Sequence, residues 1–284
     1  MTEGVAINVD TVEVDGRTIA YRWAGDGCPL VLLHGGWSDS REWRPQLEGL
    51  ADEFTVFAWD APGCGGSWDP PDDFRLPGYA DAVAGFIDAI GLERPHLLGL
   101  SFGGGLALEV HHRHPALVRS LVLASAYAGW AGSLAPDVVA ARVRRALDEA
   151  ERPPKEWVES YLPGFFAGPV AQAAVDELIA IMCDVRPAGI RPMVKAFAEA
   201  DLRDVLQAIS VPTLLLYGEL DQRSPLTVAE DMHARAPQAE LVDDLELLCF
   251  RDGCDSLGGF EIETAHEDAE SAEQGAFGFG QQRV

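Results

Sequence analysis

One short stretch, residues 96–105, restricts the fold of this chain more than any other. Five largely apolar residues lead into Ser101, and a glycine-rich segment with helical character follows it. A serine at a sharp strand-to-helix turn needs residues without a β-carbon two positions before and two after it, because the two backbones approach closely there. Gly99 and Gly103 stand at those positions. The stretch therefore predicts a strained Ser101 at a helix N-terminus, where backbone N–H groups favour developing negative charge.

Short apolar runs alternate with helical patterns on either side of this turn. Asp15-Gly16, a strong hairpin signal, separates two strand patterns near the start of the chain. Uninterrupted apolar runs are typical of parallel strands that are covered on both faces. The alternation predicts an α/β fold in which a mostly parallel sheet has flanking helices. The predicted strands are residues 7–14, 17–23, 30–33, 55–59, 96–100, 121–124, 213–217 and 240–242, and the predicted helices are 79–90, 102–114 and 225–236.

The alternation stops between the strand patterns at 121–124 and 213–217. The intervening residues have helical patterns, contain several prolines and show no convincing strand. We therefore expect a helical cap that is inserted into the sheet domain. After Val242 the composition changes, with eleven acidic and two basic residues up to Val284. The expected division is a first core part at 1–127, a cap at 128–208, a second core part at 209–242 and an atypical acidic tail at 243–284.

Three further motifs follow predicted strands. They are His34-Gly35-Gly36, the segment Asp60-Ala-Pro-Gly-Cys-Gly-Gly-Ser67, and Gly218-Glu-Leu-Asp-Gln-Arg-Ser-Pro225. Together with the turn around Ser101, they resemble the α/β-hydrolase superfamily, in its subgroup of small esterases, lactonases and carbon–carbon bond hydrolases. The resemblance covers about residues 12–242. It implies an α/β-hydrolase fold with a helical cap and a serine nucleophile, and it implies no metal or organic cofactor.

A hydrolase of acyl compounds must stabilise the oxyanion of its transition state with donors that are already in place. The N–H of Phe102, directly after the serine, is one candidate, and the resemblance implies Gly36 as the second. Trp37 is expected to shape a substrate pocket beside Gly36, and Trp130 is a further pocket candidate. For most of the cap aromatics, packing within the cap is the favoured interpretation. These residues are Trp130, Trp157, Tyr161, Phe165, Phe166 and Phe197.

Asp221 is the candidate for the acid that orients a catalytic histidine. It follows an apolar run and comes after Ser101, in the order serine, acid, histidine of this fold. The alternative is an aspartate that only stabilises a turn. His34 is expected to hydrogen-bond its own loop, and we do not assign it as the base.

The base is the point at which the chain departs from the family pattern. The resemblance implies a Gly-His some 25 to 30 residues beyond the acid, and the corresponding residues 246–251 contain no histidine. Only His233, in a predicted surface helix, and His266, in an acidic segment, follow Asp221. His266 is the candidate base. Some 24 residues separate it from Val242, and a connection of that length makes one fixed position of the imidazole entropically costly.

We therefore expect His266 to be an inefficient base and any esterase activity to be weak. Two explanations for the tail remain open: a frameshift or chimeric gene end, or a divergent member that no longer uses a base. The leading hypothesis is a serine hydrolase that acts on a small carboxylic ester, lactone or related acyl compound through an acyl-enzyme. The alternative is a ligand-binding protein of the same fold without turnover.

Composition limits the partners of the chain. Its formal net charge of −25 would repel a phosphate backbone, so nucleic acid is excluded as a partner. No run of apolar residues is long enough to span a membrane, and the first residues lack a signal pattern, so a cytoplasmic protein is expected. The five cysteines form no CxxC pair and indicate neither a disulfide framework nor a zinc site. Cys64 is expected to be a buried thiol, and the expected ligand is an apolar acyl compound.

Overall fold

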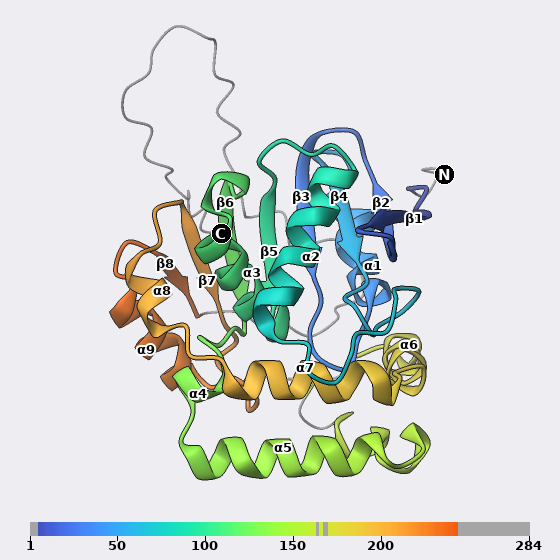
Figure 1. Ribbon diagram of the computed structural model, residues 1–284, viewed down its shortest axis with the longest axis vertical. Coiled ribbons are helices and arrows are strands. Elements are labelled where there is room, and N and C mark those ends of the chain that lie inside the picture. Colours follow the sequence, from blue (N-terminus) through green and yellow to red (C-terminus); the bar gives the residue numbers. More distant parts are fainter. Residues whose placement is uncertain (1–4, 163–164, 167–169, 244–284) are drawn as a thin grey trace, which may run out of the picture.

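A computed structural model describes residues 5–162, 165–166 and 170–243 of this chain, and in it an eight-stranded sheet carries the fold (Figure 1). The strand order is β1-β2-β4-β3-β5-β6-β7-β8. The pairs β1/β2 and β2/β4 are antiparallel, and all other neighbours are parallel. The bounds are β1 Asn8–Val14, β2 Arg17–Ala24, β3 Cys28–Leu33, β4 Phe54–Trp59, β5 His96–Leu100, β6 Ser120–Ala124, β7 Thr213–Leu216 and β8 Glu240–Val242.

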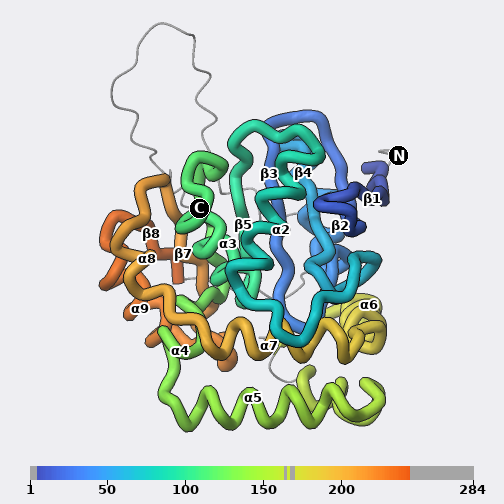
Figure 2. The backbone as a smooth tube through the Cα atoms, in the orientation of Figure 1, coloured from blue at the N-terminus to red at the C-terminus, as the bar shows by residue number. Residues whose placement is uncertain are grey.

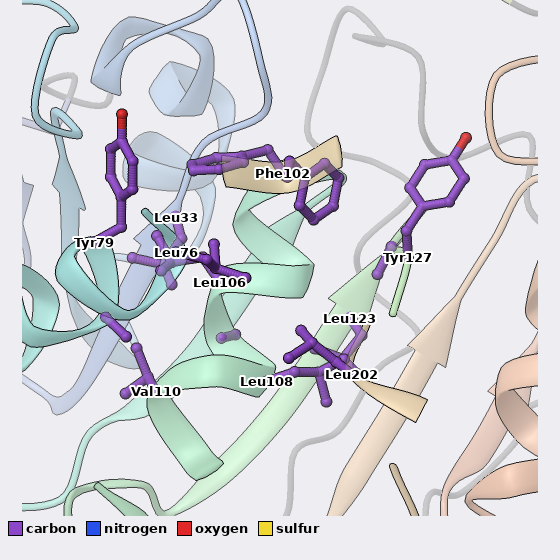
Figure 3. Close-up of a cluster of buried hydrophobic side chains, with 14 of the residues drawn as sticks. Leu33, Leu76, Tyr79, Phe102, Leu106, Leu108, Val110, Leu123, Tyr127 and Leu202 are labelled. Atoms are coloured by element: carbon purple, nitrogen blue, oxygen red, sulfur yellow. The ribbon is translucent and has the colours of Figure 1, made fainter. Parts of the chain in front are cut away.

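The central strands are buried on both faces, which explains their uninterrupted apolar sequences. In β3, Val31 and Leu33 belong to one hydrophobic cluster, and Leu30 and Leu32 belong to a second cluster on the opposite face. Helices α2 (Leu76–Ala89) and α3 (Phe102–Arg113) cover the first face, and α1 (Arg44–Gly49) covers the second. Figure 3 shows the first cluster, with Phe102 at the start of α3 between Tyr79 and Tyr127. The prediction of a mostly parallel, doubly covered sheet is confirmed.

The segment between β6 and β7 forms helices, and its described part contains no strand. Helix α7 (Pro187–Glu199) runs across the carboxyl ends of the parallel strands, and α5 (Pro136–Ala150) packs on the outer side of α7 (Figures 1 and 2). A short helix, α8 (Arg203–Gln207), leads back to the sheet and contacts α3 and α9 (Leu226–Arg235). The other bounds are α4 Trp130–Ser133 and α6 Gln172–Cys183. We refer to α4–α7 as the cap, and its exact limits stay a prediction.

The cap is joined tightly to the segment 60–67 that follows β4. A β-carbon added to Gly189 in α7 would lie 2.0 Å from the carbonyl oxygen of Gly63. Only glycine permits this approach, because no real β-carbon is found so close to a backbone atom. Arg186, just before α7, donates hydrogen bonds to the carbonyl oxygens of Gly65 and Ser67 and pairs with Asp69. Backbone contact and charge therefore hold α7 over the sheet.

Predicted and observed elements agree closely. Every predicted strand is present, with bounds within two residues of the prediction, and the helix after Ser101 begins at Phe102 as expected. The main difference is α2, which begins at Leu76 rather than at Tyr79. Pro77 lies in its first turn, where a proline is tolerated because the N–H that it lacks would be unpaired there. In the described part of the chain, no helix is both long and apolar enough to cross a membrane.

Candidate active site

Ser101 occupies the strained turn that its neighbours predict. Its backbone has φ 52° and ψ −107°, a conformation that few residues other than glycine adopt. A β-carbon on Gly103 would lie 2.0 Å from the carbonyl oxygen of Leu33, and one on Gly99 would lie 2.2 Å from that of Gly103. The side chain of Ser101 is half-buried, and no described group hydrogen-bonds to its Oγ. The serine is therefore fixed by backbone packing, and its hydroxyl is unpaired in the part of the chain that the structure describes.

The loop after β3 is held in one arrangement by His34 and Glu42. The N–H of Ala61 donates to Nε2 of His34 at 3.0 Å, so Nδ1 carries the proton and donates to the carbonyl oxygen of Gly35 at 2.7 Å. The N–H of Gly35 donates to the Glu42 carboxylate at 2.9 Å, and complete burial raises the pKa of Glu42. Both ring nitrogens of His34 are thus engaged by backbone, which agrees with its exclusion as the base.

The two predicted oxyanion donors lie on segments that touch one another. Besides its contact with Leu33, a β-carbon on Gly103 would lie 2.8 Å from the carbonyl oxygen of His34, so the first turn of α3 packs on the start of the loop. Neither the N–H of Gly36 nor that of Phe102 has an acceptor within the described ranges. The space beside the Cα of Gly36 is open to at least 4 Å. Within the described residues, two N–H groups are therefore unpaired, one directly after Ser101 and one on the loop that packs on the start of α3, and their role as the oxyanion hole stays a prediction.

Asp221, on the loop after β7, accepts three hydrogen bonds. The N–H groups of Arg223 and Ser224 donate to Oδ1 at 2.7 and 2.9 Å, and the hydroxyl of Ser125 donates to Oδ2 at 2.6 Å. Ser125 directly follows β6 and has φ 43°. Sequence reasoning missed this residue, although a serine one position beyond a buried strand was the available signal. The carboxylate is thereby fixed beside the carboxyl ends of β6 and β7.

No histidine of the described chain contacts Asp221. His233 is 3.1 Å from the carbonyl oxygen of Ala239, and His96 hydrogen-bonds to Ser120 at the amino end of β5, away from Ser101. The three remaining histidines after His34 lie at the end of α3: His111, His112 and His114. His266, the predicted base, lies outside the described residues, and its role stays a prediction.

The predicted pocket aromatics have different surroundings. Trp37 has φ 61°, and its ring centroid lies 5.8 Å from that of Tyr161 in the cap. Trp130 is buried and packs on Phe197, with 5.7 Å between the ring centroids. Phe197 in turn packs edge-on against Phe102. Trp37 therefore joins the loop after β3 to the cap, and a pocket role for Trp130 stays a prediction beside its observed packing.

The sequence predicts a buried thiol at Cys64 and no zinc site. Cys64 is buried, and burial, with a contribution from Asp60, raises the pKa of its thiol well above the ordinary value. The three cysteines in the described ranges, Cys28, Cys64 and Cys183, are all free thiols. Over those same ranges, no three His, Cys, Asp or Glu side chains come together as a metal site.

Comparison with known proteins identifies the family. The family model described as alpha/beta hydrolase family matches residues 30–248. The chain is 28% identical over 234 residues to a pimeloyl-(acyl-carrier protein) methyl ester esterase of Vibrio cholerae, covering 78% of this chain and 88% of that protein. An esterase from Exiguobacterium antarcticum superposes with a TM-score of 0.75 at 26% identity, covering 83% of this chain and 90% of that one.

A second kind of match is shorter. The chain is 36% identical over 113 residues to an uncharacterized protein of Mycobacterium bovis. This match covers 40% of this chain and 33% of that relative. The chain thus matches about a third of the length of that relative. The family match extends over most of the residues that form the sheet and the cap, and it includes Ser101 and Asp221. This chain belongs to the α/β hydrolase family.

Proposed function

We propose that this protein is a serine hydrolase that cleaves a small carboxylic ester, lactone or related acyl compound through an acyl-enzyme. The geometry of Ser101 supports the proposal: its backbone is strained, and within the described residues its hydroxyl and the N–H groups of Gly36 and Phe102 have no hydrogen-bond partner. Two of the similar proteins are named as esterases, one of them as a methyl ester esterase. The same bond class is therefore the first to test here.

In the proposed reaction, Oγ of Ser101 attacks the carbonyl carbon and its proton passes to a base. The N–H groups of Gly36 and Phe102 stabilise the negative oxygen of the tetrahedral intermediate. When this intermediate collapses, the leaving alcohol departs with a proton and an acyl-enzyme remains. Water then adds to the acyl-enzyme and releases the acid and the free serine. Asp221 would orient the base, and His266 is the remaining candidate, because the described histidines are engaged elsewhere or distant.

Replacement of Ser101 by alanine tests the proposal. Hydrolysis of p-nitrophenyl butyrate should fall by about 10⁴-fold or more if a base assists the serine, because the nucleophile and its base act as a unit. A fluorophosphonate probe should label the parent protein and not Ser101→Ala, which gives a readout that does not depend on turnover. A variant that keeps nearly the parent activity would remove Ser101 from the role of nucleophile.

One observation favours a second candidate, a ligand-binding protein without turnover. No histidine within the described residues contacts Asp221. Without a base, a serine hydroxyl is a poor nucleophile at neutral pH. Absence of both probe labelling and ester turnover in the folded parent would favour this candidate over the hydrolase.

A further inference from the structure

Arg223 lies two residues beyond the predicted acid, and its backbone is firmly held. Its N–H donates to Asp221, and its carbonyl oxygen accepts hydrogen bonds from the hydroxyl of Tyr127 and from Arg142 at 3.0 Å. Its side chain extends to the cap. The guanidinium carbon lies 4.6 Å from the ring centroid of Tyr161 and 4.2 Å from that of Phe165. The charged group therefore lies between the acid loop and the cap.

The guanidinium of Arg223 has no carboxylate partner among the described residues. Across those residues its Nε is buried without a hydrogen-bond partner, and Nη2 donates to the carbonyl oxygen of Tyr161 at 3.5 Å. Two other cap arginines have carboxylate partners, since Arg145 pairs with Glu149 at 2.7 Å and Arg191 pairs with Glu151. Arg223 is half-buried, and a partly buried charge without a counter-ion still loses some of its hydration, while an arginine keeps its charge.

The surroundings of Arg223 make this cost larger. Burial lowers the pKa of Arg223, and the nearby positive charges of Arg145 and Arg142 lower it further, against the opposing effects of Tyr161 and Asp221. Three arginines thus converge in a protein whose formal net charge is −25. The aromatic rings stabilise the face of the guanidinium through cation–π contact, but they do not satisfy the N–H groups on its edge. An anion bound at that edge would accept hydrogen bonds from these N–H groups.

Tyr161 relates Arg223 to the candidate active site. Its ring lies against the guanidinium of Arg223 and also against Trp37, which directly follows Gly36. One aromatic side chain therefore bridges the loop that supplies the acid and the loop that supplies an oxyanion donor. A ligand group bound at the edge of Arg223 would therefore lie beside the aromatic contact that links these two loops.

We infer that Arg223 binds an anionic group of the substrate, so that this site takes an ester or lactone that also carries a carboxylate, in place of the apolar acyl compound expected from the sequence. The inference rests on the proposed function. A carboxylate fits the guanidinium edge through two parallel N–H···O hydrogen bonds, which give orientation as well as affinity. Arg223 would then select the substrate, while Ser101 performs the chemistry.

The test compares two esters of equal acyl length, mono-p-nitrophenyl succinate and p-nitrophenyl butyrate. The parent should prefer the anionic ester. In Arg223→Gln the ratio of the two kcat/KM values should fall by about 10- to 100-fold, which is the contribution of a hydrogen bond between charged groups. Arg152→Gln removes the same charge from the exposed surface of the cap and should leave the ratio as in the parent. An unchanged ratio in Arg223→Gln would overturn the inference.

A binding measurement separates this inference from the proposed function. Succinate should bind the Ser101→Ala variant in a calorimetric titration, and Arg223→Gln in that background should abolish the binding. This readout needs no turnover, so it decides the role of Arg223 even if the protein proves not to hydrolyse esters. Equal thermal stability of the two variants would show that both are folded. Succinate binding that survives Arg223→Gln, or a complete lack of binding before it, would contradict the inference.

Discussion

The carboxylate of Asp221 accepts hydrogen bonds from three donors: the hydroxyl of Ser125 and the N–H groups of Arg223 and Ser224. The two N–H groups share Oδ1, and the hydroxyl is bound to Oδ2. A hydroxyl can reverse its role from donor to acceptor, whereas a backbone N–H cannot. This difference allows the charge of Asp221 to be removed without disturbing its surroundings.

Asp221→Asn should therefore remain folded, with a free energy of unfolding within about 1 kcal/mol of the parent. The amide oxygen can accept from both N–H groups, and the amide nitrogen can donate to Ser125. Asp221→Ala should lose about 1–3 kcal/mol, because it leaves those donors unpaired. Urea unfolding measures both changes.

The same substitution, Asp221→Asn, also has an expected effect on catalysis. Because Asp221 would act through the base, the rate of ester hydrolysis should fall, but no further than it falls on removing the base itself. A folded Asp221→Asn variant with the parent rate would show that this aspartate only stabilises its turn.

At the scale of elements, the turn from β5 into α3 depends on contacts between backbones. The positions that β-carbons of Gly99 and Gly103 would occupy are filled by carbonyl groups, whereas the corresponding position at Gly36 is empty. The strand, the helix and the loop after β3 can meet only because these glycines lack side chains.

Gly103→Ala should lower the free energy of unfolding by about 3 kcal/mol or more, since the added methyl meets the carbonyl oxygen of Leu33 and rigid backbone must move. Gly36→Ala is the matched control and should change it by less than about 1 kcal/mol, because its methyl meets nothing within 4 Å. Chemical denaturation of both variants is the measurement. Equal losses would mean that the turn is not as tightly packed as described.

The elements also show what sequence could and could not predict. Apolar runs such as that of β3, and the glycines on either side of Ser101, follow from local chemistry and were predicted correctly. The contacts of Ser125 with Asp221 and of Tyr127 with Arg223 each join residues 96 positions apart. Such contacts depend on how loops at neighbouring strand ends meet, and no local pattern encodes them. The position of the base also stays a prediction, because His266 lies outside the described residues.

At the scale of the whole molecule, buried histidines give stability a dependence on pH. Burial, with a smaller effect of Arg119, lowers the pKa of His96 to about 4. The unfolded chain takes up this proton near pH 6.5, whereas folded His96 does not until about pH 4. The stabilising contribution is therefore complete above pH 6.5 and is lost as the pH falls toward 4.

His96→Gln should make the protein less sensitive to acid in this window. The difference in free energy of unfolding between parent and variant should shift by about 2–3 kcal/mol in favour of the variant between pH 7 and pH 4. Urea titrations at several pH values measure it, and the difference between the two proteins removes the contributions of other groups. Parallel curves over that range would contradict this assignment.

The last expectation for the whole chain concerns residues after Val242. His266→Ala should lower ester turnover by less than the 10²- to 10⁴-fold that an effective general base contributes, because long connections fix an imidazole poorly. A chain that ends at Val242 should then resemble His266→Ala in kcat/KM. Vigorous turnover that His266→Ala alone abolishes would instead establish His266 as the base.

The attachment of α7 at both of its ends restricts the route by which substrate can enter the site and product can leave it. At its start, Gly189 touches Gly63, and at its end the carbonyl of Ala200 lies against Gly129 and accepts from Gly132. A movement of α7 away from the sheet would break these backbone contacts at both ends of the helix. Substrate and product are therefore expected to exchange past the side of the cap and not by a movement of α7.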